Sequence, residues 1–191
     1  LFSDIVTPLE AIGVDVEIKA GIGPVVAQPF RSRSDLTRLR DFSPAEDMPA
    51  LAETIKIITA ELGPQGIPLI GFCGAPFTLA SYLVEGGPSK QQSLTKAMML
   101  SDPALFRDLL TRLARIAAQS LREQVDAGAQ AVQVFDSWIG SLSRAQYREH
   151  ILPVMQELFA ELAGLGVPRT IFGVGTGPLP HLPARTGPSR A

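Results

Sequence analysis

Asp136 and Ser137 are the residues whose types and position point most directly to chemistry. They lie in the segment 135–140, FDSWIG, directly after the apolar run 131–134, so a carboxylate, a hydroxyl and the chain's only tryptophan stand where a buried strand is expected to end. Polar groups at the carboxyl end of a barrel strand point into the site. A serine hydrolase is not indicated, because no GxSxG motif surrounds Ser137. We therefore predict that this strand end faces a cleft.

Tyr82 and Asp4 are further candidates, and each has two interpretations. The segment 71–79, GFCGAPFTL, leads from a strand into a helix that contains Tyr82. Its glycines could shape a backbone for close approach to a ligand, with the Tyr82 hydroxyl aimed at it, or they could serve turn geometry beside a half-buried tyrosine. Asp4 could be a catalytic carboxylate or a helix cap. The residues alone leave both alternatives open.

Composition excludes several classes of protein. The 191 residues are 46% hydrophobic and 19% charged, with a formal net charge of −2, which favours a globular fold and predicts no nucleic-acid or anionic-membrane partner. No apolar run approaches the ~20 residues that span a bilayer. The single cysteine, Cys73, fits a reducing compartment, and we expect a soluble, cytoplasmic protein. No CxxC, HExxH or EF-hand pattern is present, so no metal site is predicted.

Apolar strand patterns alternate with amphipathic helix patterns along the chain. Strands are predicted at 14–18, 67–72, 131–135 and 167–172, and helices at 48–62, about 103–127 and from Ser143 to near Gly164. Capping boxes at Ser43–Glu46 and Ser143–Gln146 mark two helix starts. This alternation predicts an α/β fold with a parallel sheet.

Two α/β architectures compete, the doubly wound sheet and the (β/α)₈ barrel. Unusual residues follow several strands here, which favours the barrel, because a barrel distributes its site over many strand ends. A whole barrel takes about 200 residues or more, and only three or four βα units are visible. We therefore predict an α/β fold that is an incomplete TIM barrel.

Four motifs together resemble one family. These are FSDI at 2–5, GFCGAPFTLASYLVEGG at 71–87, AGAQAVQVFDSWIG at 127–140 and IFGVGTG at 171–177, and they closely resemble uroporphyrinogen decarboxylases. The resemblance runs from Leu1 to about Leu182, so we expect a partial barrel over 1–182 and an irregular tail, the product of truncation or frameshift, over 183–191. The family's N-terminal arginine-rich segment and its late histidine are absent, and we expect this chain alone to be inactive.

The resemblance implies a chemistry as well as a fold. Such enzymes are (β/α)₈ barrels, usually homodimers, that remove the carboxylates of the four acetate side chains of uroporphyrinogen III without a cofactor. It implies that Asp4 accepts hydrogen bonds from the pyrrole N–H groups, that Tyr82 and Ser137 lie near the carboxylate arms, and that Phe72 packs against the macrocycle. An ionised Asp4 would stabilise the protonated pyrrole that receives the electrons of decarboxylation.

Two alternatives stay open. Zinc-dependent, corrinoid-linked methyltransferases share the superfamily's barrel, but they resemble HxCG where this chain has Ile171–Val174, so the metal-binding His and Cys are absent. A non-catalytic partial barrel that binds tetrapyrrole or pairs with a partner chain is the other alternative.

Overall fold

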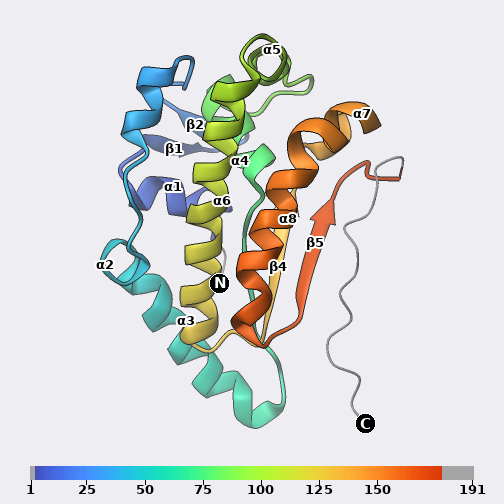
Figure 1. Cartoon of the computed structure of the whole chain (residues 1–191). Coiled ribbons are helices and arrows are strands. Elements are labelled where there is room, and N and C mark those ends of the chain that lie inside the picture. The colour runs from blue at the N-terminus through green and yellow to red at the C-terminus, as the bar shows by residue number, and fades with distance from the viewer. Residues whose placement is uncertain (1–2, 178–191) are drawn as a thin grey trace.

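The computed structural model describes residues 3–177, and the predicted tail, 183–191, lies outside them. Helices and strands alternate along most of this range (Figure 1). In chain order they are α1 (Thr7–Ala11), β1 (Val16–Lys19), β2 (Gly23–Val26), α2 (Pro44–Asp47), α3 (Pro49–Leu62), β3 (Ile70–Gly74), α4 (Pro76–Glu85), α5 (Ser93–Ser101), α6 (Pro103–Asp126), β4 (Ala131–Asp136), α7 (Arg144–Gln146), α8 (Leu152–Glu161) and β5 (Arg169–Gly173).

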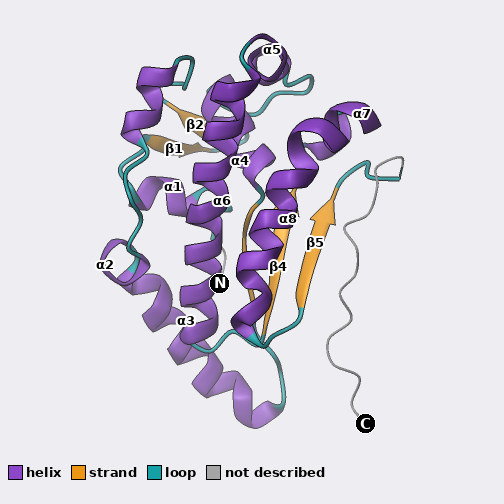
Figure 2. Ribbon diagram, in the orientation of Figure 1, coloured by secondary structure: helices purple, strands orange, loops and turns teal. Residues whose placement is uncertain are grey.

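The main sheet has three parallel strands in the order β3-β4-β5. Strands that follow one another along the chain are therefore neighbours in space, and each pair is joined through helices, as Figure 2 shows. Gly74 pairs with Phe135, and Phe135 pairs with Phe172. This sequential parallel order confirms the predicted α/β class, and the fold is that of an incomplete (β/α)₈ barrel.

The two faces of this sheet differ. Along β4, Val132, Val134 and Asp136 are buried, whereas the alternate residues are only partly buried. The long helix α6 packs against β3 and β4 on the buried face and also contacts α4 and α8. On the opposite face Phe172 of β5 is 48% exposed. Side chains alternate between faces along a strand, so one face belongs to the core and the other stays open among the described residues.

Gln124 of α6 closes the outer edge of β3. Its Oε1 accepts a hydrogen bond from the Phe72 N–H (2.8 Å), and its Nε2 donates to the Phe72 carbonyl oxygen (2.9 Å). The side-chain amide therefore takes the place that the backbone of a neighbouring strand would occupy. Gln124 is buried, and a Cβ on Gly71 would lie only 2.9 Å from its Oε1, so glycine at position 71 makes room for it.

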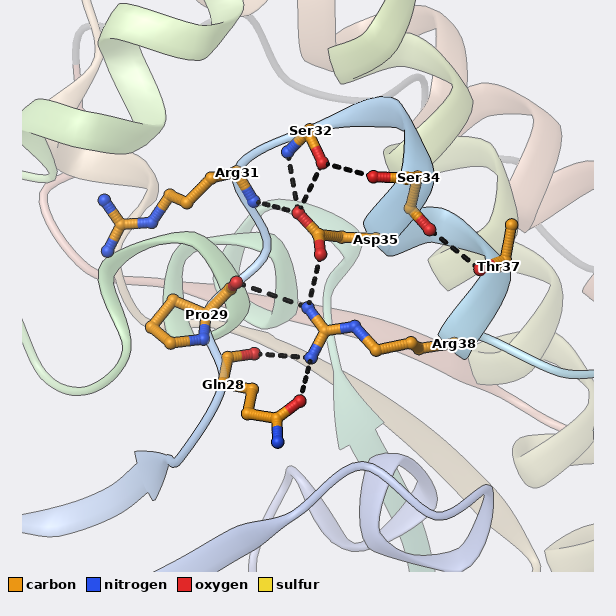
Figure 3. Close-up of polar contacts among 8 residues, drawn as sticks. All are labelled: Gln28, Pro29, Arg31, Ser32, Ser34, Asp35, Thr37 and Arg38. Carbon is orange, nitrogen blue, oxygen red and sulfur yellow. Dashed lines mark hydrogen bonds and ion pairs between the residues drawn. The ribbon is translucent and has the colours of Figure 1, made fainter.

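The predicted strand at 14–18 lies outside the parallel sheet. It forms β1, which pairs antiparallel with β2, a strand that the sequence patterns missed. In the connection that follows, Arg38 forms an ion pair with Asp35 (3.1 Å), and Asp35 also accepts a hydrogen bond from the Arg31 N–H (2.9 Å; Figure 3). The Arg38 guanidinium also lies 4.0 Å over the ring of Phe30. The Phe30 N–H donates to the Leu83 carbonyl of α4 (2.8 Å), so this connection braces α4.

The helix predicted over 48–62 is divided. Met48 adopts a non-helical conformation between α2 and α3 because it precedes Pro49, which disfavours α geometry at the residue before it. The capping box predicted at Ser43 is also wrong, since the Ser43 side chain makes no cap bond. Instead the Ser43 N–H donates to Asp47 Oδ2 (2.9 Å), and Asp47 pairs with Arg40 (2.7 Å).

The other helix predictions agree better with the structure. α6 spans Pro103–Asp126, and its cap is Asp102, which accepts from the Leu105 N–H (2.9 Å). The capping box at Ser143 and Gln146 is confirmed in both directions. The predicted helix then passes through a π-helical segment, Tyr147–Ile151, before α8, in which Pro153 lies in the first turn and has no N–H to donate.

Candidate functional site

Asp4 and Phe72 line the same small cavity, between the N-terminal segment, β3 and α6. Its volume is about 20 Å³, and Ser120 and Gln124 also line it. Asp4 is partly buried, and its Oδ1 accepts a hydrogen bond from the Val6 N–H (3.1 Å), just before α1. This bond lies within the turn before α1, whose N-cap is Val6 and has no side-chain cap, so Asp4 is not the helix cap that the sequence allowed.

Tyr82 lies on α4 and is 8% exposed, so it is more deeply buried than the half-buried packing that the sequence suggested. Its ring meets the edge of Trp138, with centroids 6.0 Å apart. Burial raises the pKa of the Tyr82 phenol, and the negative charge of Asp4 acts in the same direction. Asp4 therefore lies near enough to Tyr82 to disfavour ionisation of its phenol.

Ser137 lies in the turn that follows β4, directly before Trp138. It is partly buried, and among the described residues no hydrogen bond joins it to Asp4, Phe72 or Tyr82. Trp138 provides the connection instead, because its ring contacts Tyr82 from the next position in the chain. The structure thus brings Asp4 and Phe72 to one cavity, whereas Ser137 is linked to Tyr82 only through the neighbouring Trp138.

Asp136 does not face the open side of the sheet as predicted. It is 1% exposed and follows Val132 and Val134 on the helix-covered face. Its Oδ1 accepts a hydrogen bond from the Thr78 hydroxyl (2.8 Å), and burial raises its pKa to about 7. The prediction failed for a geometric reason. Asp136 is still inside the strand, where side chains alternate between faces.

The loops after β4 and β5 approach each other at the same end of the sheet. A Cβ on Gly140 would overlap the carbonyl oxygen of Val174 and would lie 2.9 Å from the Cα of Gly175. Gly175 has a φ of 72°, in the left-handed region that favours glycine. Two loops that contain motif residues are therefore held in backbone contact.

Three phenylalanines form a row across the open face of the sheet. The rings of Phe72 and Phe135 are 5.8 Å apart edge to face, and those of Phe135 and Phe172 are 5.7 Å apart. Phe72 contributes to this row and to the cavity that contains Asp4. A carboxylate beside an aromatic surface can hold a flat ring system that has N–H donors.

Sequence patterns did not single out Thr78 or Gln124, and they noted Trp138 only as the tryptophan beside Asp136 and Ser137, although each of the three fixes part of this region. The available signal was the spacing of Thr78 and Tyr82, which are four residues apart and so share a helix face. Within residues 3–177 no three His, Cys, Asp or Glu side chains gather where they could hold a metal ion, and none of the helices is long and apolar enough to cross a bilayer.

Known proteins resemble this chain over most of its length. The family model described as uroporphyrinogen decarboxylase (URO-D) matches residues 1–189. A protein of Streptomyces griseus named uroporphyrinogen decarboxylase is 58% identical over 186 residues, which cover 97% of this chain and 50% of that protein. The Bacillus subtilis protein of the same name is 52% identical over 92% of this chain and 49% of its own length.

The fold also occurs among solved structures. A methyltransferase from Methanosarcina mazei superposes with a TM-score of 0.68 over 92% of this chain and 51% of its own, at 20% identity, a similarity that bears on the fold alone. This chain spans about half the length of the curated relatives it matches. On the match of the family model and on relatives above 50% identity, the chain belongs to the uroporphyrinogen decarboxylase family.

Proposed function

We propose that this chain forms part of a carboxy-lyase of porphyrin biosynthesis that converts uroporphyrinogen III to coproporphyrinogen III. The reaction removes the carboxylates of four acetate side chains. Each acetate arm loses CO₂ and gains a proton, which leaves a methyl group. The observation on which the proposal rests is that Asp4 and Phe72 line one cavity in a chain of this family.

Each residue has a distinct role in this proposal. The Asp4 carboxylate accepts hydrogen bonds from the pyrrole N–H groups, and Phe72 packs against the macrocycle. Protonation of a pyrrole ring creates a cation, and when the C–CO₂ bond breaks its electron pair enters that cation. An ionised Asp4 beside the ring stabilises the cation, and this effect is strong where water is excluded. Tyr82 and Ser137 lie near the carboxylate arms.

The proposal also covers the cofactor requirement, the oligomeric state, the cellular location and the partners of the protein. We expect no cofactor, a homodimer of the whole protein and a cytoplasmic location, as the family resemblance implies. The net charge of −2 supports the expectation that no nucleic acid is bound. Because this chain spans about half of its relatives, activity is expected to need the remaining half of the barrel.

A chimera tests the proposal. This chain replaces the matching 186 residues of the Streptomyces griseus protein, and decarboxylation of enzymatically generated uroporphyrinogen III is followed by product analysis. Asp4→Asn keeps the side-chain shape but removes the charge, and we expect kcat/KM to fall by about 100-fold or more. Asp126→Ala, at an exposed position at the end of α6, is the matched control and retains activity.

The same assay includes outcomes that count against the proposal. A folded chimera with no decarboxylase activity would refute it. Equal activity of the Asp4→Asn variant and the parent would remove Asp4 from the mechanism. The 191-residue chain is assayed alongside, and turnover by this chain alone would contradict the expectation that the other half of the barrel is required.

A further inference from the structure

Thr78 and Asp136 form a buried pair that links α4 to the end of β4. Thr78 is 0% exposed and Asp136 is 1% exposed. The Thr78 hydroxyl donates a hydrogen bond to Asp136 Oδ1 at 2.8 Å, across 58 positions of sequence. Buried polar groups are costly unless they are hydrogen-bonded, so this pair fixes how the helix meets the strand.

The same hydroxyl also holds the turn that contains Ser137. The Trp138 N–H donates to Thr78 Oγ1 at 3.3 Å. A hydroxyl can donate one hydrogen bond while it accepts others, so Thr78 can make both contacts at once. The hydrogen bonds run from the backbone of the turn through Thr78 to the carboxyl group of Asp136.

Tyr82 belongs to this arrangement because it follows Thr78 by one helical turn. Residues four apart lie on the same face of a helix, and the Tyr82 ring contacts the Trp138 ring. One polar and one aromatic contact therefore join the same face of α4 to the same turn. Movement of that turn would change the position of Ser137 relative to Tyr82.

We propose that Thr78 and Asp136 are positioning residues of the decarboxylase site. They hold the Ser137–Trp138 turn in register with Tyr82 and act on the reaction through these neighbours, without touching the substrate. The proposal rests on the function proposed above. If the pair served folding alone, its loss would lower stability without changing the environment of Trp138 in the folded chain or the rate of the chemical step.

The second oxygen of Asp136 supports this role. Oδ2 is buried without a hydrogen-bond partner among the described residues, and burial raises the pKa of the carboxyl group to about 7. A neutral acid can still accept from Thr78 at Oδ1.

Trp138 gives a direct readout, because it is the only tryptophan of the 191-residue chain. Thr78→Val removes the hydroxyl but keeps the shape, and we expect the fluorescence emission of Trp138 to shift to longer wavelength as the turn loosens. Thr78→Ser restores the hydroxyl and the parent spectrum. Thr95→Val is the matched control, since the buried Thr95 hydroxyl donates to Glu85 Oε1 (2.9 Å) on the far end of α4.

Steady-state kinetics of the chimera complete the test. Thr78→Val should lower kcat by about 10- to 100-fold, as expected for displaced catalytic groups. KM should change by less than about threefold, Thr78→Ser should recover most of kcat, and Thr95→Val should retain it. Equal losses of kcat in Thr78→Val and Thr95→Val, or an unchanged Trp138 spectrum and kcat in Thr78→Val, would overturn the proposal. If every chimera is inactive, the proposed function fails, and the spectra still decide whether Thr78 holds the turn.

Discussion

The two faces of the β3-β4-β5 sheet consist of alternate residues of the same strands, yet they have different physical roles. On the covered face Val132 and Val134 lie under the helices with no exposed surface. On the open face Phe72, Phe135 and Phe172 form a row of rings, and Phe172 is 48% exposed. The first face provides hydrophobic stabilisation. The second leaves a large apolar surface unburied, which is typical of a surface that binds a ligand or another part of a protein.

The largest effect on stability is expected from the helix that covers the sheet. Leu113 of α6 is fully buried in the core, so Leu113→Ala removes apolar contacts and leaves a cavity. The free energy of unfolding should fall by about 2–5 kcal/mol. Urea denaturation followed by circular dichroism measures this loss. A loss below about 1 kcal/mol would show that α6 is not well packed on the covered face.

A smaller, pH-dependent effect is expected from Asp136, a carboxylate that is buried on the covered face. Burial raises its pKa from 3.8 to about 7, so the folded state binds a proton that the unfolded state releases. Its contribution to stability is therefore complete below about pH 4 and is lost as the pH rises through about 7. Tyr147 is a titratable neighbour of Asp136. Burial and the charge of Asp136 raise the pKa of its phenol, so Tyr147 supplies no positive charge that would keep Asp136 ionised.

Asp136→Asn removes this titration but keeps an acceptor for the Thr78 hydroxyl. We expect the unfolding free energy of the parent to fall by on the order of 2 kcal/mol more than that of the variant between pH 5 and pH 8. Urea midpoints at the two pH values provide the comparison. Parallel pH dependence in parent and variant would mean that Asp136 does not titrate in this range.

The smallest effect on stability is expected on the open face. Phe172→Ala removes a ring that is about half exposed, so unfolding free energy should change by less than about 1 kcal/mol. The same change should reduce self-association of the 191-residue chain, because it shortens the exposed aromatic row. Sedimentation velocity measures the association. Strong destabilisation by Phe172→Ala would show that the two faces do not differ as described.

The sequence predicted the parts of the fold that depend on local patterns. α6 and β4 were found within one residue at their boundaries, and the Ser143 capping box forms as expected, because periodicity and capping act over a few residues. The division of the predicted helix into α2 and α3 at Met48 is also a local effect, and Pro49 was the sequence signal for it. The β1-β2 hairpin was missed because Gly23–Val26 is short and contains a proline.

The candidate site was less predictable because it depends on which side chains meet. Family motifs indicated Asp4, Phe72 and Tyr82, and the structure brings Asp4 and Phe72 to the same small cavity. The alternation of Val132, Val134 and Asp136 could have shown that Asp136 turns toward the helices, but no pattern could reveal that Thr78 bonds to a residue 58 positions away. Only the packing of α4 against β4 creates that pair.

The hydrogen bonds of Gln124 to Phe72 have a consequence for how the chain folds while it is being synthesised. The β3 edge is complete only when a residue 52 positions later is available. At about 5–20 residues per second on the ribosome, that interval is roughly 3–10 s. During this time the Phe72 N–H and carbonyl have no Gln124 to bond, and the nascent strand can pair with another chain. Slow emergence from the ribosome of the segment between Phe72 and Gln124 should therefore increase misassembly more than an equal pause after Gln124 has emerged.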